Sequence, residues 1–267
     1  MFPVNIPKAP RSIDDDGHGQ DRSLTDDNLL ELAQEVIQRL SALSRQDASY
    51  VPVDVEGFCI ALMEPMSQEA KLMLLRAHDA GMSHQDLCVS YIAAAARQLG
   101  EWWNDDVVSF GEMSIAAGRM LNFLRDLRDL SPPVKQRGSR EAMFTTVPGE
   151  QHILGVTMAT DLMRGQGWKI DLKIGETIES LCKAARDQNY MIIGISATNA
   201  ERLRTLTATI LELRLAAPQA RIFIGGHVVD VEPDIAAHTG ADAAASGMDH
   251  CIETLEQLYL GLQAEPD

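Results

Sequence analysis

The chain has 267 residues, of which 45% are hydrophobic, and its formal net charge is −16 at pH 7. This composition is typical of a globular protein with room for two ordinary domains. The acidic excess argues against a nucleic-acid binder, because phosphate contacts require clustered Lys and Arg. The four cysteines, Cys59, Cys88, Cys182 and Cys251, lack the spacing of metal or redox motifs. Without a signal peptide or a long apolar run, the sequence predicts a cytoplasmic protein that contacts neither nucleic acid nor membrane.

The first half of the chain predicts a tail followed by helices. Residues 1–24 are rich in proline and acidic side chains and poor in large apolar ones, so we expect a disordered tail. Apolar residues then recur with helical spacing, first on one face of residues 29–43. Further helices are expected at residues 55–64, 67–80, 83–103 and 109–130. Residues 25–130 therefore predict a helical bundle.

The second half predicts an α/β domain. Residues 131–140 are proline-rich and polar, which is typical of an interdomain linker. Beyond them, short apolar runs at residues 142–147, 168–172, 191–195, 221–224 and 243–245 alternate with helical patterns. This order indicates a series of βα units with a parallel sheet. We assign residues 141–262 to this domain and residues 263–267 to a C-terminal tail.

Polar or small residues follow three of the predicted strands, where parallel α/β folds bind ligands. They are Glu150, Gln151, His152 and Gly155 after the first strand, Ser196 and Thr198 after the third, and Gly225 and Gly226 after the fourth. Neutral imidazole coordinates transition metals, so His152 is the predicted metal ligand, and Glu150 can orient its ring. Glycines permit close approach of a ligand. Alternatively, Ser196 and Thr198 cap the next helix or make a local backbone turn, and the glycine pair makes a tight strand-to-helix turn.

This pattern resembles the cobalamin-binding domain family: an acidic residue, any residue, His, two residues and Gly, then Ser after the third strand and a Gly pair after the fourth. The resemblance extends from about residue 142 to 262. It implies a flavodoxin-like or Rossmann-like parallel sheet. It also implies that His152 replaces the nucleotide base beneath cobalt, while Glu150 and Ser196 complete a hydrogen-bonded relay. The chain departs from the family in having Glu150 instead of the common Asp and Thr198 instead of the common Leu.

The helical half contains a second candidate segment. In cobalamin photoreceptors that join a helical bundle to this α/β domain, a Trp followed after nine residues by Glu-His covers the upper face of the corrin. Trp102 and Glu112 match that spacing, with Trp103 beside them, but Met113 stands in place of the His and is a weaker, softer ligand. Two other interpretations stay open, because residues 109–112 fit a capping box and both tryptophans fit a bundle core.

The segments Gly100-Glu101-Trp102-Trp103, Pro148 to His152 and Gly167-Trp168 together resemble antirepressors of photosynthesis genes in phototrophic bacteria. The resemblance implies a non-enzymatic regulator that senses light or redox state through adenosylcobalamin or hydroxocobalamin, or through haem as the alternative. It would then act on a transcriptional repressor by protein contact. The rival hypothesis is a corrinoid carrier protein of a methyltransferase system, which pairs the same two parts. A third is an interaction module that has lost its ligand.

Overall fold

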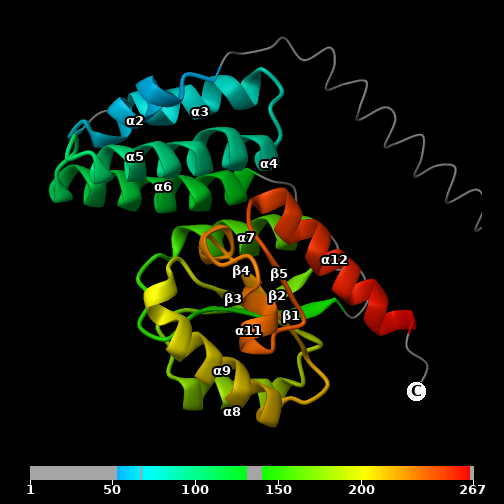
Figure 1. Ribbon diagram of the computed structural model, residues 1–267. Helices are drawn as coiled ribbons and strands as arrows, with labels where there is room; N and C mark the ends of the chain where they lie inside the picture. Colours follow the sequence, from blue (N-terminus) through cyan, green and yellow to red (C-terminus); the bar gives the residue numbers. More distant parts are fainter. Residues whose placement is uncertain (1–52, 67, 131–139, 265–267) are drawn as a thin grey trace, which may run out of the picture. The chain divides into compact units, whose positions relative to one another are not determined.

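The computed structural model of the protein describes residues 53–66, 68–130 and 140–264. The tail expected at residues 1–24, the helix expected at residues 29–43, residues 131–139 of the expected linker and residues 265–267 lie outside the described residues. The described part contains helices followed by a five-stranded parallel sheet with its own helices, which confirms the predicted fold class (Figure 1). No helix in the described ranges is long and apolar enough to cross a membrane.

The helical part begins at residue 55 and ends at residue 130. Its elements are α2 (Val55–Met63), α3 (Glu69–Asp79), α4 (His84–Leu87), the π-helix η1 (Cys88–Ala93), α5 (Ala94–Asn104) and α6 (Phe110–Leu130). Because α4, η1 and α5 follow one another without a break, they form the single helix that periodicity predicts over residues 83–103. Each of the four helices predicted in this range is present, with bounds within two residues of the prediction.

The apolar faces of these helices meet in a common core. Phe58 of α2 contacts Tyr91 of η1 with ring centroids 5.2 Å apart and an edge-to-face arrangement, and Leu62, Leu99 and Leu124 are fully buried around them. Burial of a large apolar side chain stabilises a fold by about 1.5–3 kcal/mol. The apolar residues that recur with helical spacing in the sequence are therefore the residues that form this core.

The sheet has the strand order β2-β1-β3-β4-β5, and all neighbouring strands are parallel. The strands are β1 (Glu141–Thr146), β2 (Lys169–Lys173), β3 (Ile192–Ser196), β4 (Arg221–Gly225) and β5 (Ala243–Ala245). The helices between and after them are α7 (Leu154–Gly165), α8 (Ile178–Gln188), α9 (Leu203–Ala216), α10 (Val228–Val231), α11 (Ile235–Thr239) and α12 (Met248–Ala264), with the 3-10 turn η2 (Ala200–Arg202) before α9. β1 has β2 on one side and β3 on the other, so the direction of strand order reverses there. Folds with this strand order bind ligands at the switch point between β1 and β3.

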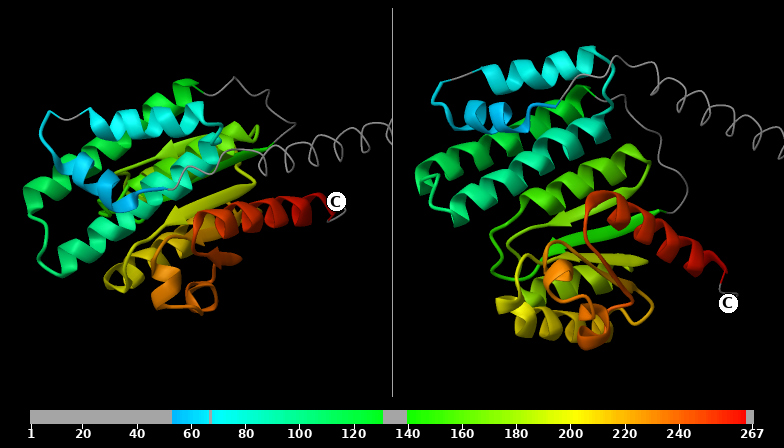
Figure 2. Two further views of the ribbon diagram at one scale, coloured as in Figure 1. Left: turned by 90° about the horizontal axis from the view of Figure 1, so that it is seen from above. Right: turned by 45° about the horizontal axis from the view of Figure 1, so that its top comes forward.

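Both faces of the sheet are covered. Phe144, Ile192 and Phe223 face one apolar core together with side chains of α7 and α12. Residues of alternate parity, such as Ile193 and Ile222, face a second core with α8 and α9. Figure 2 shows these two helix layers on opposite sides of the strands. Burial on both faces explains why the inner strands β3 and β4 are nearly continuous apolar runs, whereas the edge strand β2 alternates polar and apolar residues.

The helical part contacts the α/β part through α6 and α7. Asp161 of α7 is buried and lies 3.6 Å from the guanidinium of Arg128 of α6 and 3.8 Å from that of Arg164. Burial raises the pKa of Asp161 above its ordinary value, and the two arginines oppose that rise. A second link is the hydrogen bond from the Gln85 side chain to the Asp249 carboxylate, at 3.0 Å.

Candidate functional site

The ends of three strands lie side by side. Thr146 of β1 is in register with Ser196 of β3, which is in register with Gly225 of β4. Beyond the strands, the Val147 amide donates to the Ser196 carbonyl at 3.1 Å, and the Ala197 amide donates to the Gly225 carbonyl at 3.0 Å. The three loops that carry the predicted ligand-binding residues therefore meet at one edge of the sheet.

The loop after β1 folds a carboxylate under an imidazole. Gly149 has a φ of +83°, and the Glu150 amide donates to the Val147 carbonyl at 2.9 Å, which makes a tight turn. The turn buries the Glu150 side chain to 3% exposure and leaves the His152 side chain 69% exposed. Glu150 Oε1 accepts hydrogen bonds from the amides of Gln151 and His152 at 2.9 and 3.0 Å and lies 2.6 Å from His152 Nδ1.

These contacts favour the charged form of Glu150 and orient the His152 ring. Burial raises the pKa of Glu150, but the hydrogen bonds from the amide and ring of His152 and from the Gln151 amide outweigh it, so the net pKa is lowered. The charged carboxylate holds a proton on Nδ1 of His152, a tautomer that we infer from the hydrogen bond. With the proton on Nδ1, the Nε2 lone pair is the one available to a metal.

The other oxygen of the Glu150 carboxylate, Oε2, is buried and has no hydrogen-bond partner among the described residues. The Ser196 hydroxyl therefore does not donate to it, so this contact of the predicted Glu150–His152–Ser196 relay is not made in this structure. An unsatisfied buried acceptor costs about 1–3 kcal/mol. Such an atom next to the exposed His152 imidazole fits a site that gains a hydrogen-bond donor when a ligand binds.

The chemistry of the donor set also fits a macrocycle. Among the described residues, no group of three or more His, Cys, Asp or Glu side chains could hold a metal ion. A metal bound by protein alone needs several such ligands, whereas a metal already held in a tetrapyrrole plane needs only one axial donor. His152 is placed to be that donor.

The three predicted glycines differ in what surrounds them. A Cβ on Gly226 would lie 2.4 Å from the Ala197 carbonyl oxygen, and Gly226 has a φ of +109°, so this glycine is required by the turn itself. A Cβ on Gly225 would lie 3.3 Å from the Phe223 ring. A Cβ on Gly155, in the first turn of α7, would meet nothing within 4 Å. Gly155 is thus the glycine whose missing side chain leaves open space.

Helix capping does not account for Ser196 and Thr198. The N-cap residue of η2 is Asn199 and that of α9 is Arg202, and neither helix start has a side-chain capping hydrogen bond. Thr198 is half-buried, and the neighbouring Asn199 has a buried Oδ1 without a hydrogen-bond partner in the described structure. The capping interpretation is wrong for these two residues.

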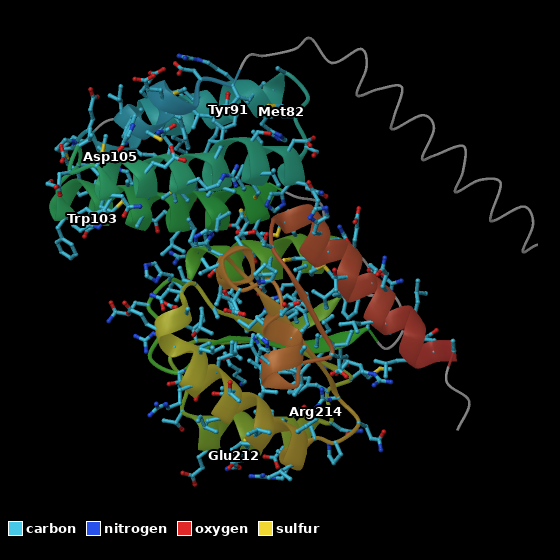
Figure 3. The ribbon with its side chains drawn as sticks, in the orientation of Figure 1. Met82, Tyr91, Trp103, Asp105, Glu212 and Arg214 are labelled. Carbon is cyan, nitrogen blue, oxygen red and sulfur yellow. The ribbon has the colours of Figure 1, made fainter. Side chains whose placement is uncertain are left out.

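The candidate upper segment lies at the turn between α5 and α6. Trp103 is 42% exposed and packs edge-on against the exposed Phe110 ring, with centroids 6.4 Å apart. Figure 3 shows Trp103 and Asp105 at this end of the helical part. Trp102 and Met113 are half-buried and pack against the apolar core. The bundle-core interpretation therefore holds in part for Trp102 and fails for Trp103.

Glu112 forms the predicted capping box. Its Oε2 accepts hydrogen bonds from the Ser109 amide at 2.8 Å and from the Ser109 hydroxyl at 2.7 Å, and its own amide donates to Ser109 Oγ at 3.3 Å. The side-chain and backbone hydrogen bonds from Ser109 lower the pKa of Glu112. This carboxylate is exposed and already serves the start of α6.

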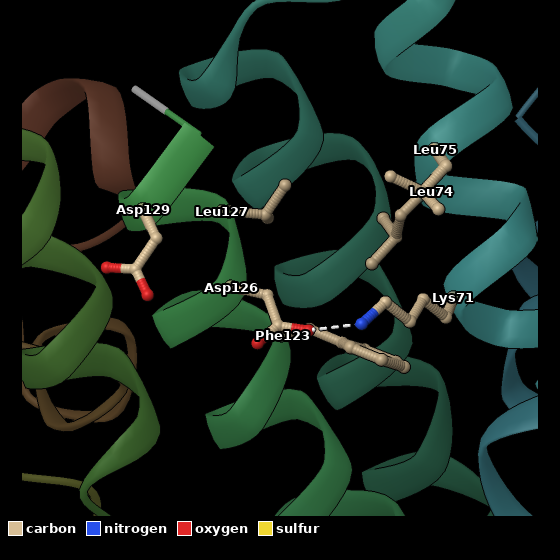
Figure 4. Close-up of a pocket in the computed structure, with 7 residues that line it drawn as sticks. All are labelled: Lys71, Leu74, Leu75, Phe123, Asp126, Leu127 and Asp129. Atoms are coloured by element: carbon tan, nitrogen blue, oxygen red, sulfur yellow. Dashed lines mark hydrogen bonds and ion pairs between the residues drawn. The ribbon is translucent and has the colours of Figure 1, made fainter. Parts of the chain in front are cut away.

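A cavity of about 230 Å³ lies elsewhere, between α3 and α6. It is lined by Lys71, Leu74, Leu75, Phe123, Asp126, Leu127 and Asp129, and Figure 4 shows the ion pair of Lys71 with Asp126, at 2.8 Å. None of the predicted ligand-binding residues lines it. The cavity carries no argument for the candidate site.

Sequence reasoning did not identify Arg202, at the end of η2. A Cβ on Gly149 would lie 2.8 Å from its Nη1 atom, so its guanidinium lies against the turn that carries Glu150. A single Arg beyond the third predicted strand matches no motif, and its proximity to the first loop is visible only once the strands pair.

Comparisons with known proteins agree with this geometry. Residues 140–250 match the family described as B12 binding domain. A relative from Rhodobacter capsulatus, described as an uncharacterized 20.5 kDa protein in the bchF-crtJ intergenic region, is 25% identical over 167 residues, which cover 61% of this chain and 87% of the relative. The solved monomethylamine corrinoid protein of Methanosarcina barkeri superposes with a TM-score of 0.64 at 13% identity, covering 78% of this chain and 97% of that one. At this identity the likeness shows a shared fold.

Proposed function

Because residues 140–250 belong to the B12-binding domain family, we propose that the protein binds a cobalamin with His152 as an axial ligand of cobalt. We further propose that it is a light- or redox-responsive regulator that acts on a transcriptional repressor by protein contact. The observation that carries the first proposal is the 2.6 Å contact between Glu150 Oε1 and His152 Nδ1 beneath an exposed ring.

Each residue has a part in this proposal. Glu150 fixes the ring tautomer and orientation, so that His152 presents Nε2 without rearrangement of the loop. Gly155 leaves open space in the first turn of α7. The buried Glu150 Oε2 and Asn199 Oδ1 are acceptors that neutral amide groups on a corrin can satisfy. When bound, the cobalamin supplies a metal with a photolabile or redox-active axial bond.

The regulatory part of the proposal rests on the sequence resemblance and on the turn between α5 and α6. Trp103 and Phe110 form an exposed aromatic pair, while Trp102 and Met113 reach the core of the helical part. We assign Trp102, Trp103 and Met113 to the upper side of the ligand. A change there would signal by favouring one of two arrangements of the helical part that differ in affinity for the repressor.

Cofactor reconstitution tests the binding proposal. The purified chain is mixed separately with adenosylcobalamin, hydroxocobalamin and haem, and absorption spectra are recorded before and after illumination. We expect a cobalamin spectrum that changes in His152→Ala and stays unchanged in His78→Ala, which removes an exposed His of α3. Identical spectra and affinities for His152→Ala and the parent would show that His152 is not the ligand. Binding of haem in place of cobalamin would move the proposal to the alternative cofactor.

The rival function is a corrinoid carrier of a methyltransferase system, favoured by the likeness to the monomethylamine corrinoid protein over almost all of that chain. Immobilised holoprotein, held in the dark or illuminated, is exposed to lysate of the source cells, and captured proteins are identified. Capture of a transcriptional repressor in one state and not the other supports the regulator. Capture of a methyltransferase, with transfer of a methyl group from bound methylcobalamin to its substrate, supports the carrier.

A further inference from the structure

The guanidinium of Arg202 lies across the turn that holds Glu150 and His152. A Cβ built on Gly149 would lie 2.8 Å from Nη1 and 3.6 Å from Cζ of Arg202, so the guanidinium packs directly against the backbone of Gly149. Gly149 also has a φ of +83°, a conformation that other residues rarely adopt. A half-buried cation is thus held beside the loop of the candidate metal ligand.

The Arg202 side chain has no hydrogen bond or ion pair with any residue in the described ranges, although the chain carries a formal charge of −16. Two other arginines of the α/β part are paired: Arg214 binds Asp242 and two carbonyl oxygens, and Arg140 binds Glu256. The nearby Glu150 carboxylate takes its hydrogen bonds from the amides of the loop and the His152 ring instead. The donors of the Arg202 guanidinium are therefore available to an anion from outside the chain.

The backbone beside Arg202 favours the same kind of ligand. Arg202 precedes α9, a helix of 14 residues whose start has no side-chain cap. The positive end of the helix dipole favours a negatively charged oxygen, and arginine pairs with phosphate through two parallel hydrogen bonds.

We propose that Arg202 binds the phosphodiester of the nucleotide tail of cobalamin. This inference rests on the proposed function. The corrin side chains of cobalamin are neutral amides, and the phosphodiester is its anionic group outside the ring. Once His152 takes the place of the nucleotide base at cobalt, that tail must be held away from the metal. Arg202 supplies the cation for it, and its guanidinium packs against the backbone of Gly149.

The test compares cobalamin with cobinamide, which keeps the corrin and lacks the phosphodiester and nucleotide. Affinities are measured by titration for the parent, Arg202→Gln, Arg202→Lys and Arg204→Gln, which removes an exposed positive charge from the first turn of α9. We expect Arg202→Gln to weaken cobalamin binding about tenfold or more. Its cobinamide affinity should equal that of the parent. Arg202→Lys should lie between, because Lys retains the charge and loses the bidentate geometry, and Arg204→Gln should match the parent.

Four results would overturn the inference. Parent-like cobalamin affinity in Arg202→Gln shows that the guanidinium does not hold the ligand. Equal losses for cobalamin and cobinamide show that Arg202 supports the turn alone. Loss of haem affinity without loss of cobalamin affinity assigns Arg202 to the carboxylates of haem. Failure of the parent to bind either corrinoid overturns both the proposed function and the inference. This outcome differs from the other three because it is seen in the parent protein, with Arg202 intact.

Discussion

The loop after β1 and the turn between α5 and α6 each place an acidic side chain next to a candidate ligand-binding residue, yet they use it differently. Glu150 is buried and accepts three hydrogen bonds, one from the His152 ring. Glu112 is exposed and caps its own helix through Ser109. The first carboxylate orients the imidazole that we propose as a metal ligand, and the second stabilises a helix start. An acidic residue close in sequence to a candidate ligand-binding residue therefore does not by itself show that the two act together.

The aromatic residues beside Glu112 are a second difference between the two regions. Next to Glu112, the chain offers exposed Trp103 and Phe110 and no nitrogen donor at residue 113. The lower side of the proposed ligand is thus defined by a polar, pre-oriented donor. The upper side is defined by apolar surface, so we expect it to act through packing rather than coordination.

The largest predicted effect is a loss of cobalamin affinity when the lower side of the proposed site is disrupted. In Glu150→Ala the His152 ring loses the acceptor that fixes its tautomer, and loss of such a partner lowers metal affinity by about 10- to 100-fold. Cobalamin affinity measured by spectral titration checks this. Glu253→Ala, which removes an exposed carboxylate of α12, is the matched control. An affinity of Glu150→Ala equal to that of the control would contradict the role of Glu150.

The second prediction concerns the upper side. Glu112→Ala removes half of the capping box, so the free energy of unfolding should fall. The cobalamin spectrum should not change, because Glu112 does not orient a metal ligand. Urea unfolding and absorption spectra of the same variant give both values. A spectrum altered as much as that of Glu150→Ala would show that the two carboxylates act alike.

The third prediction separates stability from binding. A Cβ at Gly155 of α7 or at Gly118 of α6 meets nothing within 4 Å, and Ala is preferred to Gly in a helix by about 0.5–1 kcal/mol. Gly155→Ala and Gly118→Ala should therefore both raise the melting temperature of the ligand-free protein. Gly155→Ala alone should weaken cobalamin binding. Unchanged binding in Gly155→Ala would mean that the ligand does not use that space.

The fourth and smallest effect is a pH dependence. The folded-state pKa of Glu150 lies below the ordinary value of 4.5, so its contribution to stability is complete above pH 4.5 and is lost as the pH falls through the folded-state pKa. The difference in unfolding free energy between the parent and Glu150→Gln should therefore shrink in acid. Denaturant unfolding at a series of pH values measures it. A difference that grows below pH 4.5 would contradict the direction of the pKa shift.

Local sequence patterns predicted the fold well because they report the packing directly. Apolar runs on both faces of a parallel sheet gave strands within one residue of the observed bounds, and helical spacing gave α2 to α6. The π-helical turn at Cys88–Ala93 was not predictable, because it changes the hydrogen-bond pattern without changing which residues are apolar.

The candidate site was predictable where a motif lies within one loop, and less so across loops. The contact of Glu150 with His152 could be predicted because the two residues are only two positions apart in one loop. The unbonded Glu150 Oε2, the missing Ser196 contact and the position of Arg202 against Gly149 depend on side-chain conformations after three strands have paired. No single-sequence pattern encodes those distances.

The central claim is that His152 coordinates cobalt. Electron paramagnetic resonance of the cobalt(II) form, with the protein labelled with ¹⁵N-histidine and unlabelled cobalamin, tests it most directly. An axial ¹⁴N nucleus splits the cobalt lines into triplets, and an axial ¹⁵N nucleus splits them into doublets. We predict triplets in unlabelled protein, doublets in labelled parent protein and no doublets in labelled His152→Ala. Triplets that persist in the labelled parent would mean that the nucleotide base remains on cobalt, and they would contradict the account.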